Sequence, residues 1–231
     1  MSALKDILGL PDNFQIPQIL SAKVFASESF HPIIALPEEY EVFDFSQGYD
    51  PERNLQFPFG IGKYNEHRPT MYEGEQFHYE ELQHQRTVHM GIDIAAPVDT
   101  EIYAFEDGYV FAVDNNDLPF DYGPTLITKH EICGFVFWAL YGHLRLDVLQ
   151  KMHVGKSFKK GDIIAHIGDK NENGGWNPHV HFQLSTVAPP EGTCDLPGVV
   201  SLQDRELATR IFPDPRLVLG QLYGDFLSLS C

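Results

Sequence analysis

Short β-prone runs, separated at regular intervals by turn-forming residues, occupy the chain between about residues 88 and 187. The turns contain Gly, Asp and Asn, as in Glu106-Asp107-Gly108 and Lys160-Gly161-Asp162. Evenly spaced short strands with such turns are typical of an antiparallel sheet, sandwich or barrel. We therefore expect a mainly β fold with an antiparallel β-sandwich or barrel-like core. The predicted strands are Thr100–Phe105, Gly108–Val113, Pro124–His130, Phe135–Tyr141 and Asp162–Ile167.

The segments on either side of this core are less regular. The N-terminal part is rich in Pro and aromatic residues, with possible strands at Gln18–Phe25 and Tyr40–Phe45, and Phe57–Gly62 is interpreted as a loop. After Pro189-Pro190, the pattern predicts one short helix around Ser201–Ile211. We expect three parts: an irregular N-terminal extension packing on the core (1–80), the core (81–190) and a C-terminal extension with a short helix (191–231).

The composition weighs against nucleic acid and membrane partners. The 231 residues are 43% hydrophobic, enough for a packed core, and 33 acidic against 16 basic residues give a formal net charge of −17. Binding to nucleic acid or to an anionic membrane surface needs clustered Lys and Arg, so we expect neither partner. Three cysteines without a CxxC spacing argue against a disulfide framework. The N-terminal residues do not resemble a signal peptide. We therefore expect a cytoplasmic location, unless the chain is exported by another route.

Two polar clusters stand out within the predicted core, His89-Met90-Gly91-Ile92-Asp93 and Pro178-His179-Val180-His181-Phe182. Residues i and i+2 of a strand share one face, with their Cα atoms about 6.5–7 Å apart. His179 and His181 can therefore face one site, where one imidazole binds a metal and the other stands over a bound water. Val180 would point to the opposite face, into apolar packing.

His89 and Asp93 can share an ion only if the backbone between them bends. Four residues of straight strand span about 13 Å, whereas ligand bonds to zinc are close to 2 Å long. Gly91 is where a bend costs least. Two neutral imidazoles and one carboxylate are a common ligand set for catalytic zinc, with the fourth position left to water. Such a site lowers the pKa of the bound water and polarises an amide carbonyl.

Together with the sequence between them, these clusters resemble the signatures of the M23 peptidases, the LytM/lysostaphin-like metallopeptidases. His89-x-x-x-Asp93 and His179-x-His181 match the paired HxxxD and HxH motifs of that family. Further stretches match in order and register, so that the resemblance covers roughly residues 88–187. These stretches are Thr100–Val110, Leu140–Leu144 and Phe158–Ala165.

The resemblance implies a zinc metalloendopeptidase with a groove over one zinc ion per chain. It implies that His89, Asp93 and His181 are the metal ligands. It also implies that His143 and His179 flank the water and the tetrahedral intermediate. A metal-activated water would attack a peptide carbonyl, for example in a peptidoglycan-type, muropeptide-like or Gly/Ala-rich peptide. Which of His143 and His179 acts as acid and which as base stays open, as does the oligomeric state.

The sequence departs from the family pattern at several positions. Pro178 stands where members commonly have Gly, and Gln183 stands where a Glu often follows the second motif. The Tyr that some members place shortly before the first His has no clear equivalent here, and Tyr79 is no more than a candidate for it. Two alternatives therefore remain: a catalytically silent M23-like binding or regulatory module, and a zinc hydrolase of a small intracellular amide. Retention of all five site residues favours the peptidase, because a scaffold needs neither His143 nor His179.

Other polar residues have simpler interpretations. His130 and His166 lie in predicted strands, where most histidines are hydrogen-bonded structural residues. Trp176, beside the HxH motif, either lines the groove or anchors packing. Some relatives carry an inhibitory plug over the groove, although a solvated loop is the expected role for the N-terminal segment here. The residues that could provide a plug are Asn65, His67, His78 and His84.

Overall fold

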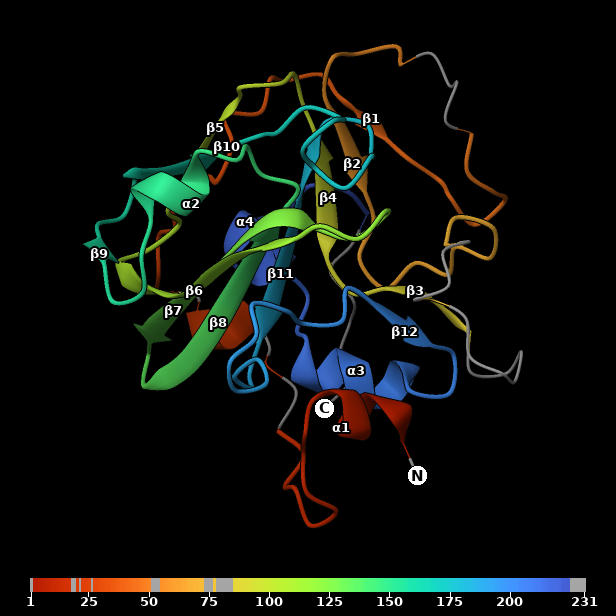
Figure 1. Cartoon of the computed structure of the whole chain (residues 1–231), viewed down its shortest axis with the longest axis vertical. Coiled ribbons are helices and arrows are strands. Elements are labelled where there is room, and N and C mark those ends of the chain that lie inside the picture. Colours follow the sequence, from red (N-terminus) through yellow and green to blue (C-terminus); the bar gives the residue numbers. More distant parts are fainter. Residues whose placement is uncertain are drawn as a thin grey trace.

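The computed structural model shows a mainly β protein built around one eight-stranded sheet (Figure 1). The structure describes residues 2–17, 20, 22–25, 27–50, 55–72, 77 and 85–224. The β1–β2 pair is parallel and the other pairs in this sheet are antiparallel. In order across the sheet, the strands are β1 (Glu41–Val42), β2 (Gly60–Gly62), β4 (Ile92–Ala95), β11 (His179–Ser185), β8 (Phe135–Gly142), β7 (Gly123–Ile132), β6 (Gly108–Asn116) and β9 (Ser157–Phe158).

Two small antiparallel sheets and several short helices surround the large sheet. The small sheets pair β5 (Glu101–Tyr103) with β10 (Ile163–His166), and β3 (Arg86–His89) with β12 (Val199–Ser201). The helices are α1 (Ala3–Ile7), α2 (Val148–Lys151), α3 (Arg205–Ile211) and α4 (Arg216–Leu219), with a 3-10 helix at Ala22–Phe25. Among the described residues, no helix is both long enough and apolar enough to cross a membrane.

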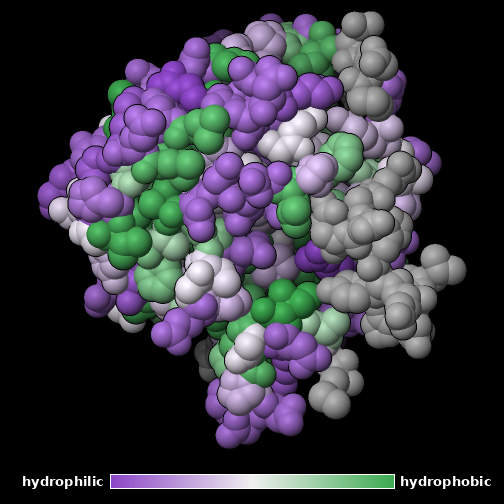
Figure 2. All heavy atoms as spheres, in the orientation of Figure 1, coloured by the Kyte–Doolittle hydropathy of each residue, from purple (hydrophilic) through white to green (hydrophobic). Residues whose placement is uncertain are grey.

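The two ends of the chain contribute to one region of the surface. Figure 1 shows α1 and α3 side by side below the large sheet. The Ser2 hydroxyl and the Leu4 backbone N–H both donate to the Asp204 carboxylate, at 2.5 and 3.2 Å. Figure 2, in the orientation of Figure 1, shows hydrophilic residues over much of the face toward the viewer. Hydrophobic patches interrupt them on the side of α2 and β9.

The predicted mainly β fold is confirmed, whereas two interpretations in the N-terminal part are wrong. Phe57–Gly62, expected to be a loop, contains β2, which pairs with β4. Glycines have low strand propensity, so this strand carries no β signal of its own. Gln18–Phe25, a possible strand, instead contains the 3-10 helix; residues 18, 19 and 21 of that run lie outside the described residues. The predicted C-terminal helix is α3, which begins at Arg205.

Alternation along β11 gives the large sheet a core face and a polar face. Val180, Phe182 and Leu184 are buried in the larger apolar cluster, as predicted for Val180. Burying each such side chain contributes about 1.5–3 kcal/mol, which anchors the strand in this register. The alternate residues therefore face the other side, and His179, His181 and Gln183 lie there. Asp93 joins them, because it pairs with His181 across β4 and β11.

Residues from both ends of the chain are buried with the strands of the sheet. Ile33 and Ile34 belong to the larger apolar cluster, and the Phe25 ring lies 5.5 Å from the Phe137 ring of β8. Val218 of α4 belongs to the same cluster. The boundaries predicted at 80/81 and 190/191 stay predictions.

Candidate metal centre and catalytic site

Three residues from three different strands meet on the polar face of the sheet. His89 ends β3, Asp93 lies in β4, and His181 lies opposite Asp93 in β11. His89 Nε2, Asp93 Oδ1 and His181 Nδ1 lie 3.0 Å from one another in every pair. All three side chains are buried. The structure thus brings together the three residues that the sequence predicts as metal ligands.

The predicted bend between His89 and Asp93 lies between β3 and β4, which belong to different sheets. Glycine is required at position 91 because the bend leaves no room for a side chain there. A Cβ at this position would lie 2.4 Å from Cε1 of His181 and 2.9 Å from the Phe182 carbonyl oxygen. Gly91 therefore lets the His181 ring approach the backbone of the bend, a role that the sequence pattern alone does not indicate.

Neighbouring carbonyl groups fix which nitrogen of each imidazole faces the cluster. His89 Nδ1 lies 3.0 Å from the Lys63 carbonyl oxygen, which can only accept, so Nδ1 carries the proton and Nε2 keeps its lone pair. The Gln183 amide NH₂ donates to the Pro197 carbonyl at 3.3 Å. Its Oε1 therefore accepts from His181 Nε2 at 3.0 Å, which leaves Nδ1 of His181 as an acceptor.

Three acceptor atoms consequently converge on one point, which is unfavourable unless a cation or a proton lies among them. In a tetrahedral zinc site with bonds of about 2.0–2.1 Å, neighbouring ligand atoms are about 3.3 Å apart, close to the separations found here. A backbone carbonyl, as at His89, is a usual partner of a metal-binding histidine. At His181 the Gln183 amide oxygen accepts the ring N–H in the same way. His89, Asp93 and His181 therefore fit a single zinc ion.

A buried arginine holds the second oxygen of Asp93. Arg68 is 1% exposed, and its Nη1 donates to Asp93 Oδ2 at 2.8 Å and to the Tyr72 hydroxyl at 3.1 Å. Its Nε donates to Glu66 Oε2 at 3.0 Å. Burial by itself would raise the pKa of Asp93, but His89 and Arg68 hold it well below its usual range. Asp93 is therefore ionised, with one oxygen committed to Arg68 and the other to the cluster.

The protonation of His89 also suits metal binding. Burial, followed by the nearby Arg68 charge, lowers the pKa of His89 to about 4. The imidazole is therefore neutral near pH 7, the state in which it can bind a metal.

His143 and His179 lie together beside the cluster, with ring centroids 4.2 Å apart. Their Nδ1 atoms donate to the carbonyl oxygens of Asn173 (2.8 Å) and Asn177 (2.7 Å), so each Nε2 is an acceptor. His179 Nε2 is 3.9 Å from Asp93 Oδ1. Burial lowers the pKa of both histidines, and in His143 the neighbouring His179 adds to the effect.

The backbone of His143 is strained. Its φ of +62° lies in the left-handed region, which a histidine rarely adopts. Two backbone hydrogen bonds hold it there, from its N–H to the Tyr122 carbonyl at 2.7 Å and from the Gly168 N–H to its own carbonyl at 3.0 Å. Strain of this kind is common at functional sites, where it aims a side chain.

All five predicted site residues line one cavity of about 200 Å³. Arg68, Tyr72 and Trp176 line it too, so Trp176 both faces the groove and packs against other rings. Arg68, Glu66 and Gln183 are the residues that sequence reasoning missed as partners of the site. Arg68 and Glu66 lie in a segment without periodicity, and the only sequence signal at Gln183 is its departure from a family pattern.

The residues considered for an inhibitory plug do not line this cavity where they are described. The Asn65 side chain accepts from Arg205 Nε at 2.7 Å, and His67 forms a β-bridge with Val88. His78 and His84 lie outside the described residues, as does Tyr79.

The structural interpretation of His130 agrees with its contacts. It is buried, its Nε2 is 2.8 Å from the Thr128 hydroxyl, and its Nδ1 is 2.9 Å from the Asp107 carbonyl oxygen. His166 lies in β10 and does not line the cavity.

Fold and site together define a mainly β protein with a buried His-Asp-His cluster that could hold a metal ion, flanked by two further histidines. Residues 87–191 match the model of peptidase family M23, and the chain contains a peptidase domain of this family. No curated protein matches the sequence.

Several solved structures are similar to parts of the chain. A zinc-containing peptidase from Vibrio cholerae is 29% identical, and the match covers 42% of this chain and 27% of that chain, with a TM-score of 0.34. The catalytic domain of a mutant of EnpA, a prophage-encoded M23 protein from Enterococcus faecalis, is 27% identical (59% and 87% covered, TM-score 0.40). The catalytic domain of the antimicrobial peptidase lysostaphin from Staphylococcus simulans is 18% identical (62% and 88% covered, TM-score 0.41). This chain spans about a quarter of the length of the Vibrio cholerae peptidase.

Proposed function

We propose that this protein is a zinc-dependent metallopeptidase that hydrolyses a peptide bond with a water activated at the centre of His89, Asp93 and His181. The observation that carries the proposal is the convergence of three acceptor atoms, 3.0 Å apart, within an M23 peptidase domain. A bound zinc ion supplies Lewis-acid polarisation of the substrate carbonyl and lowers the pKa of a water.

The surrounding residues orient the ligands. Lys63 and Gln183 fix the tautomers of His89 and His181, so that both imidazoles present a lone pair. Arg68 holds Asp93 Oδ2 and leaves Oδ1 for the metal. Such partners fix the orientation of the ligands. Loss of one commonly lowers metal affinity by about 10–100-fold.

His143 and His179 supply the proton transfers. Each presents an Nε2 acceptor to the cavity, because each Nδ1–H is committed to a backbone carbonyl. When water attacks the carbonyl carbon, one imidazole takes its proton and the resulting imidazolium stabilises the negative charge on the oxygen. When the C–N bond breaks, a proton passes from an imidazolium to the leaving amine nitrogen.

The test combines metal content with cleavage. Elemental analysis of the wild type, after zinc reconstitution, should give one zinc per chain, and His181→Ala should give none. His166→Ala, which changes a histidine outside the cavity, is the matched control and should keep the zinc. Wild type should cleave muropeptides or oligoglycine in a chelator-sensitive manner.

The two measurements separate the alternatives. Zinc without cleavage of any peptide would favour a silent binding module, and cleavage of small amides alone would favour the small-amide hydrolase. A wild type without stoichiometric zinc would overturn the proposal.

A further inference from the structure

A second cavity adjoins the metal centre. Its volume is about 480 Å³, within the range of small-molecule sites. It shares Met71, Asp93, Trp176 and His179 with the first cavity, so the two hollows meet at the catalytic residues.

Small residues make the floor of this second cavity. Ala95 lies two residues after Asp93 in β4, on the same face, and pairs with His179 of β11 and with Gly60 of β2. A Cβ on Gly60 would lie 2.1 Å from Cζ of Phe43, so this glycine lets the Phe43 ring lie directly on the strand. Beside His179, the floor therefore carries only the Cβ methyl of Ala95, and the Phe43 ring, which lies on Gly60, bounds it on one side. A larger side chain at position 95 would fill this part of the cavity.

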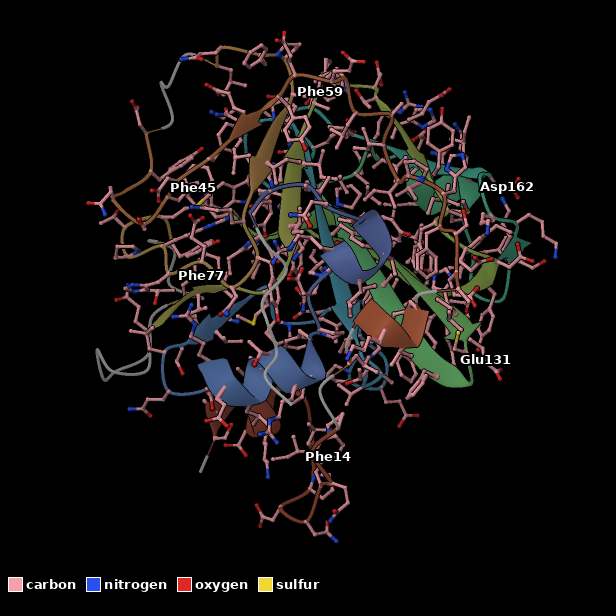
Figure 3. The ribbon with its side chains drawn as sticks, turned by 180° about the vertical axis from the view of Figure 1, so that it is seen from behind. Phe14, Phe45, Phe59, Phe77, Glu131 and Asp162 are labelled. Carbon is pink, nitrogen blue, oxygen red and sulfur yellow. The ribbon has the colours of Figure 1, made fainter. Side chains whose placement is uncertain are left out.

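Aromatic and other apolar side chains make the walls. The Phe45 and Tyr49 rings are 5.9 Å apart, and the Tyr49 and Trp176 rings are 6.2 Å apart. Leu55 stands at the cavity with 47% of its surface exposed. Figure 3 shows Phe45 on the same side of the molecule as Phe77, which lines the first cavity.

The two cavities differ in charge. The first is lined by two arginines, Arg68 and Arg86, and by carboxylates that include Asp121 and Asp195. Among the described residues that line the second cavity, the charged groups are carboxylates alone, and one of them, Asp93, is paired with Arg68. A chain passing over the catalytic histidines therefore meets charged groups on one side and an apolar hollow on the other.

The geometry points to an apolar specificity subsite: the second cavity takes a bulky aromatic or long aliphatic side chain from the residue that flanks the scissile amide. This placement beside a scissile bond rests on the proposed peptidase function. A glycine or alanine would leave most of the hollow unfilled. Filling it with a Phe or Leu side chain favours binding roughly 10–100-fold over Gly, from the apolar surface removed from water.

Binding can be measured without catalysis. The chain has two tryptophans, so Trp138→Phe leaves Trp176, at the cavity, as the fluorescent reporter. Titration with N-acetyl-phenylalaninamide, N-acetyl-leucinamide and N-acetyl-glycinamide should show at least about tenfold tighter binding of the first two.

Variants then place the binding in the second cavity. Ala95→Leu fills the floor and should abolish the preference, and Leu55→Ser, at an exposed position, should reduce it several-fold. Leu202→Ser is the matched control, because Leu202 is 52% exposed and lines neither cavity. It should keep the preference unchanged.

Cleavage of peptide pairs that differ only in Gly or Phe beside the scissile bond completes the test. A tenfold or greater preference in kcat/KM for the Phe peptide, lost in Ala95→Leu, supports the subsite. Selective binding of the amides without cleavage of any peptide would reject the peptidase function and keep the subsite. Equal binding, or no binding, of the three amides by folded protein would overturn the subsite even if peptides are cleaved.

Discussion

Replacing Gln183 with Leu tests whether the hydrogen bond to His181 prepares the metal centre. Gln183 is fully buried, and its Oε1 accepts from His181 Nε2 at 3.0 Å. Leu has a similar size but accepts no hydrogen bond. In the metal-free Gln183→Leu variant, the His181 proton can move to Nδ1 and be donated to Asp93 Oδ1, 3.0 Å away. Zinc binding must then return that proton to Nε2, where it has no partner.

The magnitude follows from the cost of that unpaired donor. A buried polar group without a partner costs about 1–3 kcal/mol, which corresponds to roughly 5–150-fold in affinity. We therefore expect the zinc Kd of Gln183→Leu to rise about 10–100-fold, in line with other losses of ligand-orienting hydrogen bonds. The assay is equilibrium competition with a colorimetric zinc chelator at pH 7.5, with circular dichroism to check the fold.

Thr128→Val is the matched control, because it removes a 2.8 Å contact to Nε2 of another buried histidine, His130, away from the metal centre. It should lower stability by about 1 kcal/mol and leave the zinc Kd unchanged. If folded Gln183→Leu binds zinc within twofold of the wild type, or if Thr128→Val weakens binding equally, the reasoning about the His181 tautomer is refuted.

Three further outcomes are expected. His143→Ala and His179→Ala should each lower kcat/KM about 10²–10⁴-fold while elemental analysis still finds zinc; loss of zinc would contradict the proposed roles. The pKa of His130 is lowered by burial from 6.5 to about 4. The unfolded chain therefore takes up this proton first, and stability should fall by about 3 kcal/mol between pH 6.5 and 4. Urea unfolding should show that this pH slope is smaller in His130→Gln. Phe182→Ala should cost about 3–5 kcal/mol in the same assay, because Phe182 is fully buried in the larger apolar cluster.

The sequence predicts the mainly β core because its strands have strong local signals. Regular turns and β-branched or aromatic runs mark β6, β7 and β8, and the structure moves only their ends. The short strand β2 has no such signal, because two of its three residues are glycine. Those glycines are required by their neighbours: a Cβ on Gly62 would lie 2.8 Å from Asp93 Oδ2 and 2.9 Å from Arg68 Nη2. Packing around the site therefore overrides strand propensity here.

The predicted site residues also come together in the structure. The features that place them, side-chain alternation along a strand and a bend at a glycine, are local and can be recognised in the sequence. His179 and His181 share a face by spacing alone, and Gly91 marks the bend between His89 and Asp93. Arg68 could not be predicted in this way, because its approach to Asp93 depends on how the N-terminal segment crosses the sheet. Long-range contacts of this kind leave no periodic trace in the sequence.

These contacts make residues 63–68 part of the candidate metal centre. The residues that carry the HxxxD motif would, by themselves, leave two buried polar groups without partners: Nδ1–H of His89 and Oδ2 of Asp93. Their partners are the Lys63 carbonyl and the Arg68 guanidinium. A fragment limited to the predicted core, 81–190, would therefore lack the groups that orient His89 Nδ1 and Asp93 Oδ2. The segment before the motif thus fixes the tautomer of His89 and holds one oxygen of Asp93, which are the states that the proposed metal site requires.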